Sequence, residues 1–327
     1  MQFMITPDAL KLDAAAESAR IEASIRRAVF GEFRRKGAVV GVSGGIDSSV
    51  VASLCARALG SDRVIALFTP EADSSPESFD LGRLLAEQLN VRWFLEDISP
   101  ILLAARCYQR RDEAIRKLVP DYGPGWLMKI VLPLITDSAK YALYSLVVQS
   151  PAGETRKVRL SVDAYLGVVA FTNFKQRTRK MMEYYYADRY NYCVAGTPNR
   201  LEYDQGFFVK NGDGSADFKP IAHLYKSQVY QIAEYLGVPE QIRRRPPTTD
   251  TYSLAQTQEE FYFSLPLDKM DLCLYAYDCR VPAGELASIV GLTPQQAAHV
   301  YESIESKRKV AHYLHAAPVL VEAVGKV

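Results

Sequence analysis

The sequence predicts an α/β protein built on a doubly wound, parallel sheet. From residue 38 onward, short apolar runs that suit buried strands alternate with longer segments of helical spacing. A glycine-rich turn joins the first apolar run to the helical segment after it. Alternation of this kind places helices on both faces of a parallel sheet, and functional side chains then gather where the strands end.

The N-terminal part predicts a helix and a βαβ unit. Apolar residues recur every fourth position within residues 13–35, which indicates an amphipathic helix. Residues 38–42 form a continuous apolar run, typical of a buried strand. We expect a helix over residues 50–59 and a second strand over residues 64–68.

The unit continues with a third strand. Ser75 supplies a helix N-cap, and Pro76 suits the first helical position. The helix should run to Leu89, where a strand over residues 91–95 follows.

The alternation breaks after this strand. Residues 144–149 and 155–160 have strand patterns on either side of a short turn, which predicts a β-hairpin. We therefore expect residues 98–171 to be an insertion within one domain that spans residues 1–327.

The α/β order resumes after the insertion. Residues 173–189 predict a helix, residues 192–195 a short strand, and residues 221–236 another helix. Residues 282–327 should form a helical C-terminal extension, in which Thr293–Gln296 has the pattern of a capping box.

Composition excludes several classes of protein. The 39 Lys and Arg residues balance 38 Asp and Glu residues, which argues against a dedicated nucleic-acid binder. No apolar stretch approaches the ~20 residues that cross a bilayer, and the N-terminus has no signal-peptide pattern, so we expect a cytoplasmic protein without membrane contact. The five cysteines include no CxxC pair, which favours buried thiols over disulfides or a zinc site.

The segment Ser43–Ser49 carries the strongest chemical signal. Glycines let a backbone approach an anion closely, hydroxyls donate hydrogen bonds, and the following helix N-terminus attracts negative charge. A phosphate chain fits this arrangement. The segment lacks the lysine of a Walker A loop, which argues against γ-phosphoryl transfer of that kind. The alternative is a turn that merely joins strand to helix, but that leaves the cluster of Ser43, Asp47, Ser48 and Ser49 unexplained.

The segment resembles the pyrophosphate-binding loop of the ATP pyrophosphatases, and a second block resembles the NAD synthetase family within that group. Residues 196–217 are similar to the family signature of G-T-x-N-x-x-E followed by G-x-F-T-K-x-G-D-G-x-x-D. Residues 173–179 and 246–250 match two further family motifs, and the resemblance covers most of residues 20–270. It implies a Rossmann-like fold of the adenine nucleotide alpha-hydrolase type.

The resemblance also implies the chemistry. ATP would adenylate the carboxylate of nicotinic acid adenine dinucleotide (deamido-NAD) with release of pyrophosphate, and ammonia would then displace AMP to form NAD. Asp47, Lys226 and Glu202 would act in catalysis, with Asp47 and Glu202 as ligands of Mg²⁺. The residues implied to bind ATP are Ser43, Gly44, Gly45, Ile46, Asp47, Ser48, Ser49, Thr197, Lys226 and Thr248.

Four further residues match positions that bind deamido-NAD in the family: Arg177, Lys210, Asp217 and Lys307. The family places this dinucleotide at a subunit interface, so the resemblance implies a homodimer. The chain shows no segment resembling a glutaminase, which predicts free ammonia or a separate partner as nitrogen source. Adenylation of a related acceptor such as nicotinate mononucleotide is the alternative reaction.

The sequence departs from the family pattern near its end. Family members have a His-Lys-Arg motif, whereas this chain has Ser306 before Lys307 and Arg308. His312 and His315 are spaced for a metal, but without a third ligand they more often lie on a surface.

Two readings outside catalysis remain open. Residues 282–303 have the outline of a helix-turn-helix, but the second helix has no basic residue until Lys307, which disfavours DNA binding. A nucleotide sensor without chemistry is disfavoured by the joint presence of Asp47, Glu202 and Lys226. Singly, Glu202 could be a helix N-terminal charge, Lys226 a solvated surface residue, and Arg177 half of a surface ion pair.

Overall fold

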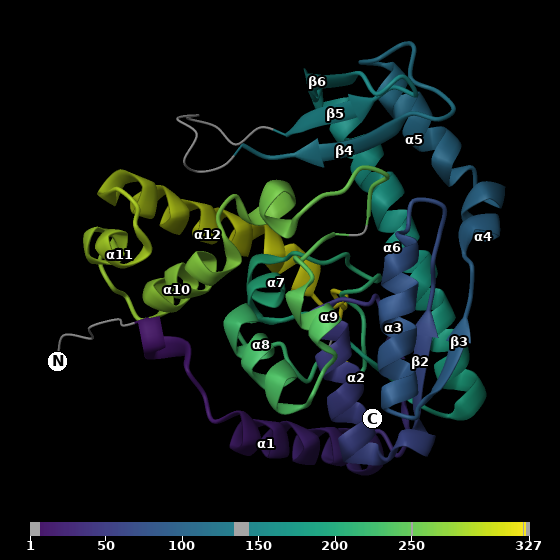
Figure 1. The fold of residues 1–327 in the computed structure, drawn as a ribbon, viewed down its shortest axis with the longest axis vertical. Coiled ribbons are helices and arrows are strands. Elements are labelled where there is room, and N and C mark those ends of the chain that lie inside the picture. Colours follow the sequence, from purple (N-terminus) through teal and green to yellow (C-terminus); the bar gives the residue numbers. More distant parts are fainter. Residues whose placement is uncertain (1–6, 134–143, 250, 323, 325–327) are drawn as a thin grey trace.

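The computed structural model describes residues 7–133, 144–249, 251–322 and 324. Its centre is a four-stranded parallel sheet in the order β3-β2-β1-β7, of which Figure 1 labels β2 and β3. This confirms the predicted parallel α/β fold. The strands are β1 (Ala38–Gly41), β2 (Val64–Phe68), β3 (Arg92–Leu95) and β7 (Cys193–Ala195).

Strands β1, β2 and β7 are buried on both faces, because successive side chains point in opposite directions and helices cover each side; the edge strand β3 is largely exposed. Ala38 and Val40 of β1 pack into the core formed with helices α1, α2, α3 and α8, whereas Val39 packs on the other face against α6. These helices are α1 (Ala14–Arg26), α2 (Ile46–Leu59), α3 (Pro76–Gln88), α6 (Val162–Tyr190) and α8 (Lys226–Tyr235).

Strand β1 is the topological switch point of the sheet, where the order of the strands reverses. Its neighbours are β2, which follows it in the chain, and β7, which lies more than 150 residues further on. A crevice opens at the carboxyl ends of two such strands in doubly wound folds. The loops after β1 and β7, at Val42–Gly45 and Gly196–Asn199, therefore meet at one place.

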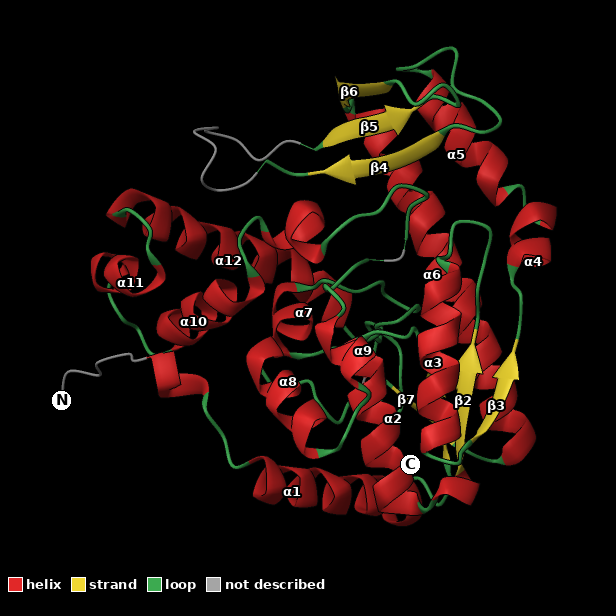
Figure 2. Ribbon diagram, in the orientation of Figure 1, coloured by secondary structure: helices red, strands yellow, loops and turns green. Residues whose placement is uncertain are grey.

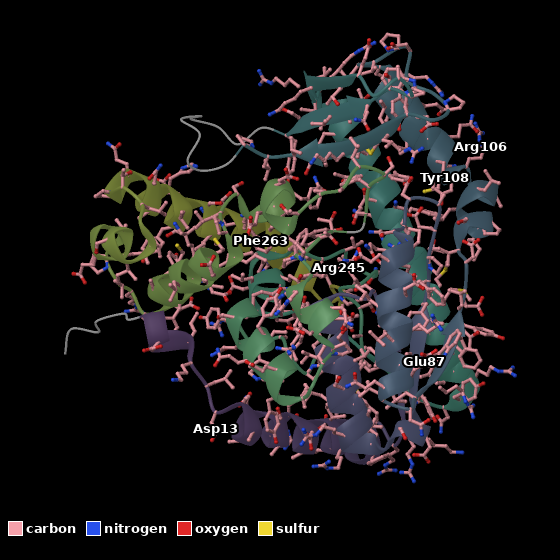
Figure 3. All side chains as sticks on the ribbon, viewed as in Figure 1. Asp13, Glu87, Arg106, Tyr108, Arg245 and Phe263 are labelled. Carbon is pink, nitrogen blue, oxygen red and sulfur yellow. The ribbon has the colours of Figure 1, made fainter. Side chains whose placement is uncertain are left out.

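The first helix shows how local sequence sets an element boundary. Asp13 caps α1 by accepting hydrogen bonds from Ala15 N and Ala16 N at 3.1 and 3.0 Å, and Figure 3 labels it at that helix end. The prediction of one helix over residues 13–35 was too long: the α-helix ends at Arg26, and a π-helical turn, η2 (Arg27–Glu32), follows.

Three other predicted helices have different starts. The helix predicted over residues 50–59 begins at Ile46, directly after the glycine turn. The one predicted over residues 173–189 is part of the 29-residue α6, whose N-cap is Ser161. The one predicted over residues 221–236 begins only at Lys226, because Asp271 caps that position from a distant helix.

Residues 98–171 contain a second, antiparallel sheet of order β4-β5-β6 (Figure 2). The predicted hairpin is confirmed as β5 (Ser145–Gln149) and β6 (Thr155–Arg159). Strand β4 (Leu127–Val131) was not predicted, because Lys129 interrupts its apolar run. Two short helices precede the sheet, α4 (Ser99–Ala104) and α5 (Cys107–Arg116).

The C-terminal helices form their own core beside the α/β unit. The capping box at Thr293 is confirmed, since Thr293 Oγ1 accepts a hydrogen bond from Gln296 N at 3.2 Å. The helices of this region are α10 (Leu267–Asp278), α11 (Ala283–Val290) and α12 (Pro294–His315). Shorter elements are α7 (Arg200–Gln205), α9 (Glu240–Arg244), η1 (Pro7–Leu10), η3 (Ser61–Arg63) and η4 (Glu259–Phe263).

The structure bears on the expectations about apolar helices and cysteines. Within the described residues, no helix is both long and apolar enough to span a bilayer. All five cysteines are free thiols; four are buried as predicted, and Cys279 is half-buried.

Candidate active site

The loop after β1 has a conformation that requires glycine. Gly44 has a φ of +72°, and a Cβ at this position would lie 2.3 Å from the carbonyl oxygen of Ser78. The turn delivers the chain to Gly45, the N-cap of α2. The first backbone N–H groups of a helix have no partner within it, so this end of α2 can receive an anion.

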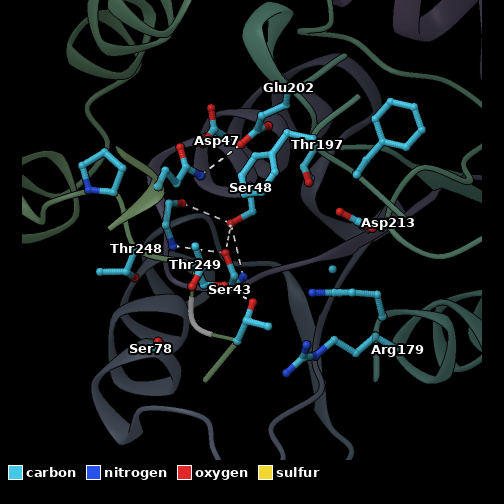
Figure 4. A pocket seen from close by; sticks show the side chains of 18 of the residues that line it. Ser43, Asp47, Ser48, Ser78, Arg179, Thr197, Glu202, Asp213, Thr248 and Thr249 are labelled. Atoms are coloured by element: carbon cyan, nitrogen blue, oxygen red, sulfur yellow. Dashed lines mark hydrogen bonds between the residues drawn. The ribbon is translucent and has the colours of Figure 1, made fainter. Parts of the chain in front are cut away.

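Serine hydroxyls hold the loop in shape. Ser48 Oγ accepts a hydrogen bond from Ser43 N at 3.2 Å and donates one to the carbonyl oxygen of Gly45 at 3.1 Å. Ser49 Oγ donates to the same carbonyl at 2.8 Å. Figure 4 shows Ser43 and Ser48 joined at the edge of the cavity.

A cavity of about 420 Å³ opens over this loop. It lies where the ends of β1 and β7 meet, with α6 on one side and residues 245–262 on another. The predicted site residues that line it are Ser43, Gly45, Ile46, Asp47, Ser48, Thr197, Glu202, Lys226 and Thr248.

Asp47 lies at the centre of the polar contacts in this cavity. Its two carboxylate oxygens accept hydrogen bonds from Lys226 Nζ and, at 3.0 Å, from Asn199 Nδ2. Glu202 lies beside it (Figure 4) and accepts bonds from Asn199 N and Gln258 Nε2, both at 3.1 Å. The structure thus brings together the three predicted catalytic residues, which come from α2, α7 and α8.

The charges in this cluster perturb one another. Burial raises the pKa of Glu202, and the neighbouring negative charge of Asp47 raises it further. Burial alone would lower the pKa of Lys226, but the carboxylates of Asp47 and Glu202 more than offset this and raise it. Two carboxylates that face one buried ammonium leave this end of the cavity able to accept another cation.

A third carboxylate fixes Lys226 from behind. Asp271 of α10 is fully buried and accepts hydrogen bonds from Lys226 N at 3.1 Å and Ser227 N at 2.7 Å. Burial raises the pKa of Asp271 to about 6. The residue satisfies the first N–H groups of α8, and it links the C-terminal helices to the site. Its role depends on a contact between distant segments, so sequence reasoning did not find it.

The opposite wall carries an arginine that was not assigned a role. Arg179 of α6 lines the cavity, and its Nε donates to the carbonyl oxygen of Thr69 at 3.2 Å. Arg177 is exposed and donates to the carbonyl oxygen of Lys210 at 3.2 Å. Two positions along a helix correspond to about 200° of rotation. The two arginines of one motif therefore face opposite sides of α6.

A buried lysine joins the loops around the cavity. Lys175 of α6 is fully buried, and its Nζ lies 2.8 Å from Glu71 Oε1 and 3.2 Å from Asp73 Oδ2. The same ammonium donates to the carbonyl oxygen of Thr251 at 2.6 Å. Removing one partner from a buried pair typically costs about 3–5 kcal/mol, so this contact strongly favours one arrangement of the loops.

The four predicted deamido-NAD residues do not line the cavity. Lys210 Nζ donates to the carbonyl oxygens of Tyr313 and Ala316 at the end of α12, both at 2.9 Å. Asp217 is exposed and accepts a hydrogen bond from Val194 N at 2.7 Å. Lys307 Nζ donates at 2.8 Å to the carbonyl oxygen of Tyr262, a residue that does line the cavity.

Two more predicted loop residues, Gly44 and Ser49, shape the loop without lining the cavity. In the predicted motif 246–250, Asp250 lies outside the described residues.

Aromatic side chains form the remaining wall of the cavity. The rings of Tyr144 and Tyr165 stack with their centroids 4.9 Å apart, and Tyr144 also lies against Phe261. Tyr252 meets Phe261 edge to face. Such a wall can stack on a flat heteroaromatic ring. Tyr144 comes from the segment next to β5, so the small sheet contributes directly to the cavity.

The family model for NAD synthase matches residues 17–119 and 154–312. The chain belongs to the NAD synthase family. This confirms the family predicted from the sequence motifs and agrees with the Rossmann-like fold. The match leaves out residues 120–153, which contain β4 and β5.

Relatives in sequence match most or nearly all of the chain. It is 58% identical over 317 residues to an NH(3)-dependent NAD(+) synthetase of Mesorhizobium japonicum, a match of 97% of this chain and 99% of the relative. A protein of the same description from Thermotoga maritima is 37% identical and matches 73% of this chain and 80% of its own.

Solved structures share the fold at lower identity. An NMN synthetase from Francisella tularensis superposes with a TM-score of 0.62 at 23% identity, covering 95% of this chain and 99% of its own. An NH3-dependent NAD synthetase from Campylobacter jejuni gives 0.60 at 22% identity, covering 95% of this chain and 100% of its own.

The burial of Lys307 predicts a pH-dependent contribution to the free energy of unfolding. Burial lowers its pKa from the ordinary 10.5 to about 7. Between these values the unfolded chain binds more protons than the folded one, so this group makes the free energy of unfolding rise with pH from about 7 upward. Lys307→Met removes the effect. In urea denaturation, the stability of the variant relative to wild type should fall from about pH 7 to about pH 9, by at most about 1.4 kcal/mol per unit. A difference independent of pH would contradict the burial of the ammonium.

Proposed function

We propose that the protein is an ammonia-dependent NAD synthetase, which uses ATP to convert deamido-NAD to NAD and releases AMP and pyrophosphate. The observation that carries this proposal is the end-to-end likeness to NH(3)-dependent NAD(+) synthetases at 57–58% identity. The geometry of the cavity supports it, because Asp47, Lys226 and Glu202 meet beside a phosphate-type loop.

The triphosphate of ATP would lie on the loop after β1. Ser43, Gly45 and Ser48 line the cavity at the N-terminus of α2, where a pyrophosphate would find both hydrogen-bond donors and positive potential. Lys226 would offset charge that develops on the leaving pyrophosphate. Thr197 and Thr248 would add contacts to ATP from two other walls.

The two carboxylates fit a magnesium ion. Among the described residues no cluster of three or more His, Cys, Asp or Glu side chains suits a metal. Asp47 and Glu202 could nevertheless share an ion with phosphate oxygens, because Mg²⁺ prefers oxygen ligands and is commonly held by one or two carboxylates plus substrate phosphates. A cation here would relieve the repulsion by Asp47 that, in addition to burial, raises the pKa of Glu202. Bound Mg²⁺ would supply neutralisation of the phosphate charge.

The acceptor would extend from the cavity to the protein surface. The carboxylate that reacts must reach the phosphates, while Arg177, Lys210, Asp217 and Lys307 lie outside the cavity lining. We propose that these four residues bind the dinucleotide together with a second subunit.

A homodimer is supported by the outer surface of α6, which exposes Met181 and Tyr185 by 58% and 54%, close in sequence to Arg177. Light scattering on active protein should give twice the 36.6 kDa mass of one chain. A single-chain mass with full activity would contradict the dimer. We also propose that the enzyme works in the cytoplasm, where ATP and deamido-NAD are available.

The products distinguish the proposed chemistry from its alternatives. With ATP, Mg²⁺, ammonium and deamido-NAD, purified protein should form NAD, AMP and pyrophosphate in equal amounts, because the loop is suited to retain pyrophosphate. Chromatography and mass spectrometry of the mixture give the measurement. Parallel reactions with nicotinate mononucleotide and with ammonia-free glutamine test the acceptor and the nitrogen source. Stoichiometric ADP and inorganic phosphate, or equal turnover with the mononucleotide, would overturn the proposal.

Glu202→Gln tests the role of the second carboxylate. The substitution keeps the shape and removes the charge, so we expect the single-turnover rate of adenylation to fall by about two to three orders of magnitude, or roughly 2.7–4 kcal/mol. The Mg²⁺ concentration for half-maximal rate should rise, and acceptor affinity should change little. Unchanged adenylation with weakened deamido-NAD binding would instead place Glu202 in the acceptor site.

A further inference from the structure

Strand β4 is bonded on both edges. One edge pairs with β5, and the other faces residues 251–262, which follow the loop at Pro246–Thr249 and include most of η4. Met128 N donates to Ser253 Oγ at 2.9 Å, and Met128 O accepts from Leu254 N at 3.1 Å. Leu132 N donates to the carbonyl oxygen of Glu260 at 2.8 Å. The small sheet therefore holds this segment by its backbone.

Two side chains add tethers along the same edge. Gln256 is only 4% exposed, and its Nε2 donates to the carbonyl oxygen of Ile130 in β4. Lys129 Nζ donates to the carbonyl oxygen of Ala255 at 3.0 Å and pairs with Glu260 Oε2 at 2.9 Å. A segment with little regular structure thus has a buried, well-bonded neighbour over most of its length.

The other side of the segment is the candidate active site. Gln256 O accepts a hydrogen bond from Thr249 N at 3.2 Å, and Gln256 Oε1 accepts one from Thr249 Oγ1 at 3.2 Å. Gln258 N donates to the carbonyl oxygen of Pro247 at 3.2 Å, and its Nε2 donates to Glu202. Thr249, Pro247 and Gln258 all line the cavity. Gln256 forms hydrogen bonds both to β4, at Ile130, and to the cavity wall, at Thr249.

We propose that the small sheet is a positioning element for the ATP site, and that Gln256 is the positioning residue through which β4 fixes Thr249. The ligand in this inference rests on the proposed function. Strands β4 and β5 lie in residues 120–153, outside the match to the family model. The proposed positioning by this sheet therefore belongs to this chain and to those that share the segment.

The physical reason is preorganisation. A loop that is free in the absence of ligand must lose conformational freedom when the ligand binds, and that loss weakens binding. Hydrogen bonds from β4 order the wall beforehand. Weakening them should raise the KM for ATP, while the acceptor and the catalytic cluster around Asp47 stay in place.

Gln256→Met tests this, because the side chain keeps nearly the same volume and loses both hydrogen bonds. We expect the KM for ATP to rise about five- to tenfold, the factor for about one net hydrogen bond, with kcat and the KM for deamido-NAD changed less than twofold. Lys129→Met removes the second tether at a half-buried position, and a smaller rise of the same kind is expected. Lys157→Ala on the exposed strand β6 is the control in the same sheet and should leave all constants unchanged.

The outcomes separate this inference from the proposed function. If wild type fails to make NAD and AMP, the proposed function is wrong, and ATP binding measured by calorimetry still reports on the sheet. If wild type is active but both Met variants keep the wild-type KM for ATP, the inference is overturned. A parallel loss of kcat for all substrates with a lower melting temperature, in both variants, would show a purely structural role and would also overturn it.

Discussion

The buried ion pair between Lys226 and Asp47 is the contact on which the rest of the site depends. A lysine this deeply buried stays charged only beside carboxylates, and Asp47 and Glu202 supply them. To make the pair, the start of α2, the loop after β7 and the start of α8 must converge. The glycine turn at Gly44 and the cap from Asp271 are the local conditions that permit it.

Different parts of the fold supply different parts of the site around this pair. The parallel sheet and its helices supply the glycine-rich loop after β1, and the C-terminal helices secure Lys226 through Asp271. The residues between α5 and α6 supply an aromatic wall at Tyr144 and a backbone edge at β4. The buried Lys175 joins the loop after β2 to the segment after Thr249, so neighbouring walls of the cavity are held by charge as well as by packing.

The sequence predicted those features whose causes are local. The strand, turn and helix around Ser43–Ser49 follow from a short stretch of residues, and the structure confirms them. The start of α8 was misplaced because its cap, Asp271, lies 45 residues from Lys226. Strand β4 was missed because Lys129 interrupts its apolar run, and its hydrogen bonds to residues 253–260, more than 120 residues away, leave no local signal.

Site residues whose roles depend on distant contacts were missed for the same reason. The motifs assigned Asp47, Glu202 and Lys226 to one site, and the structure places these side chains together. The motifs assigned no role to Arg179, which lines the cavity, because a motif does not say which face of α6 a residue occupies. Gln256 and Lys175 resemble ordinary polar residues until their buried partners are known. The deamido-NAD roles of Arg177, Lys210, Asp217 and Lys307 stay predictions.

In the proposed reaction, the acceptor carboxylate attacks the α-phosphate of ATP in the cavity beside Asp47 and Lys226. The most direct measurement follows an oxygen atom. Deamido-NAD labelled with ¹⁸O in its carboxylate is incubated with ATP, Mg²⁺, ammonium and the protein, and the phosphorus-containing products are analysed by mass spectrometry. An acyl-adenylate passes one labelled oxygen to AMP when ammonia displaces it, so the label should appear in AMP and not in pyrophosphate. Label in inorganic phosphate, with unlabelled nucleotide, would contradict the account, because it would show attack on the terminal phosphate.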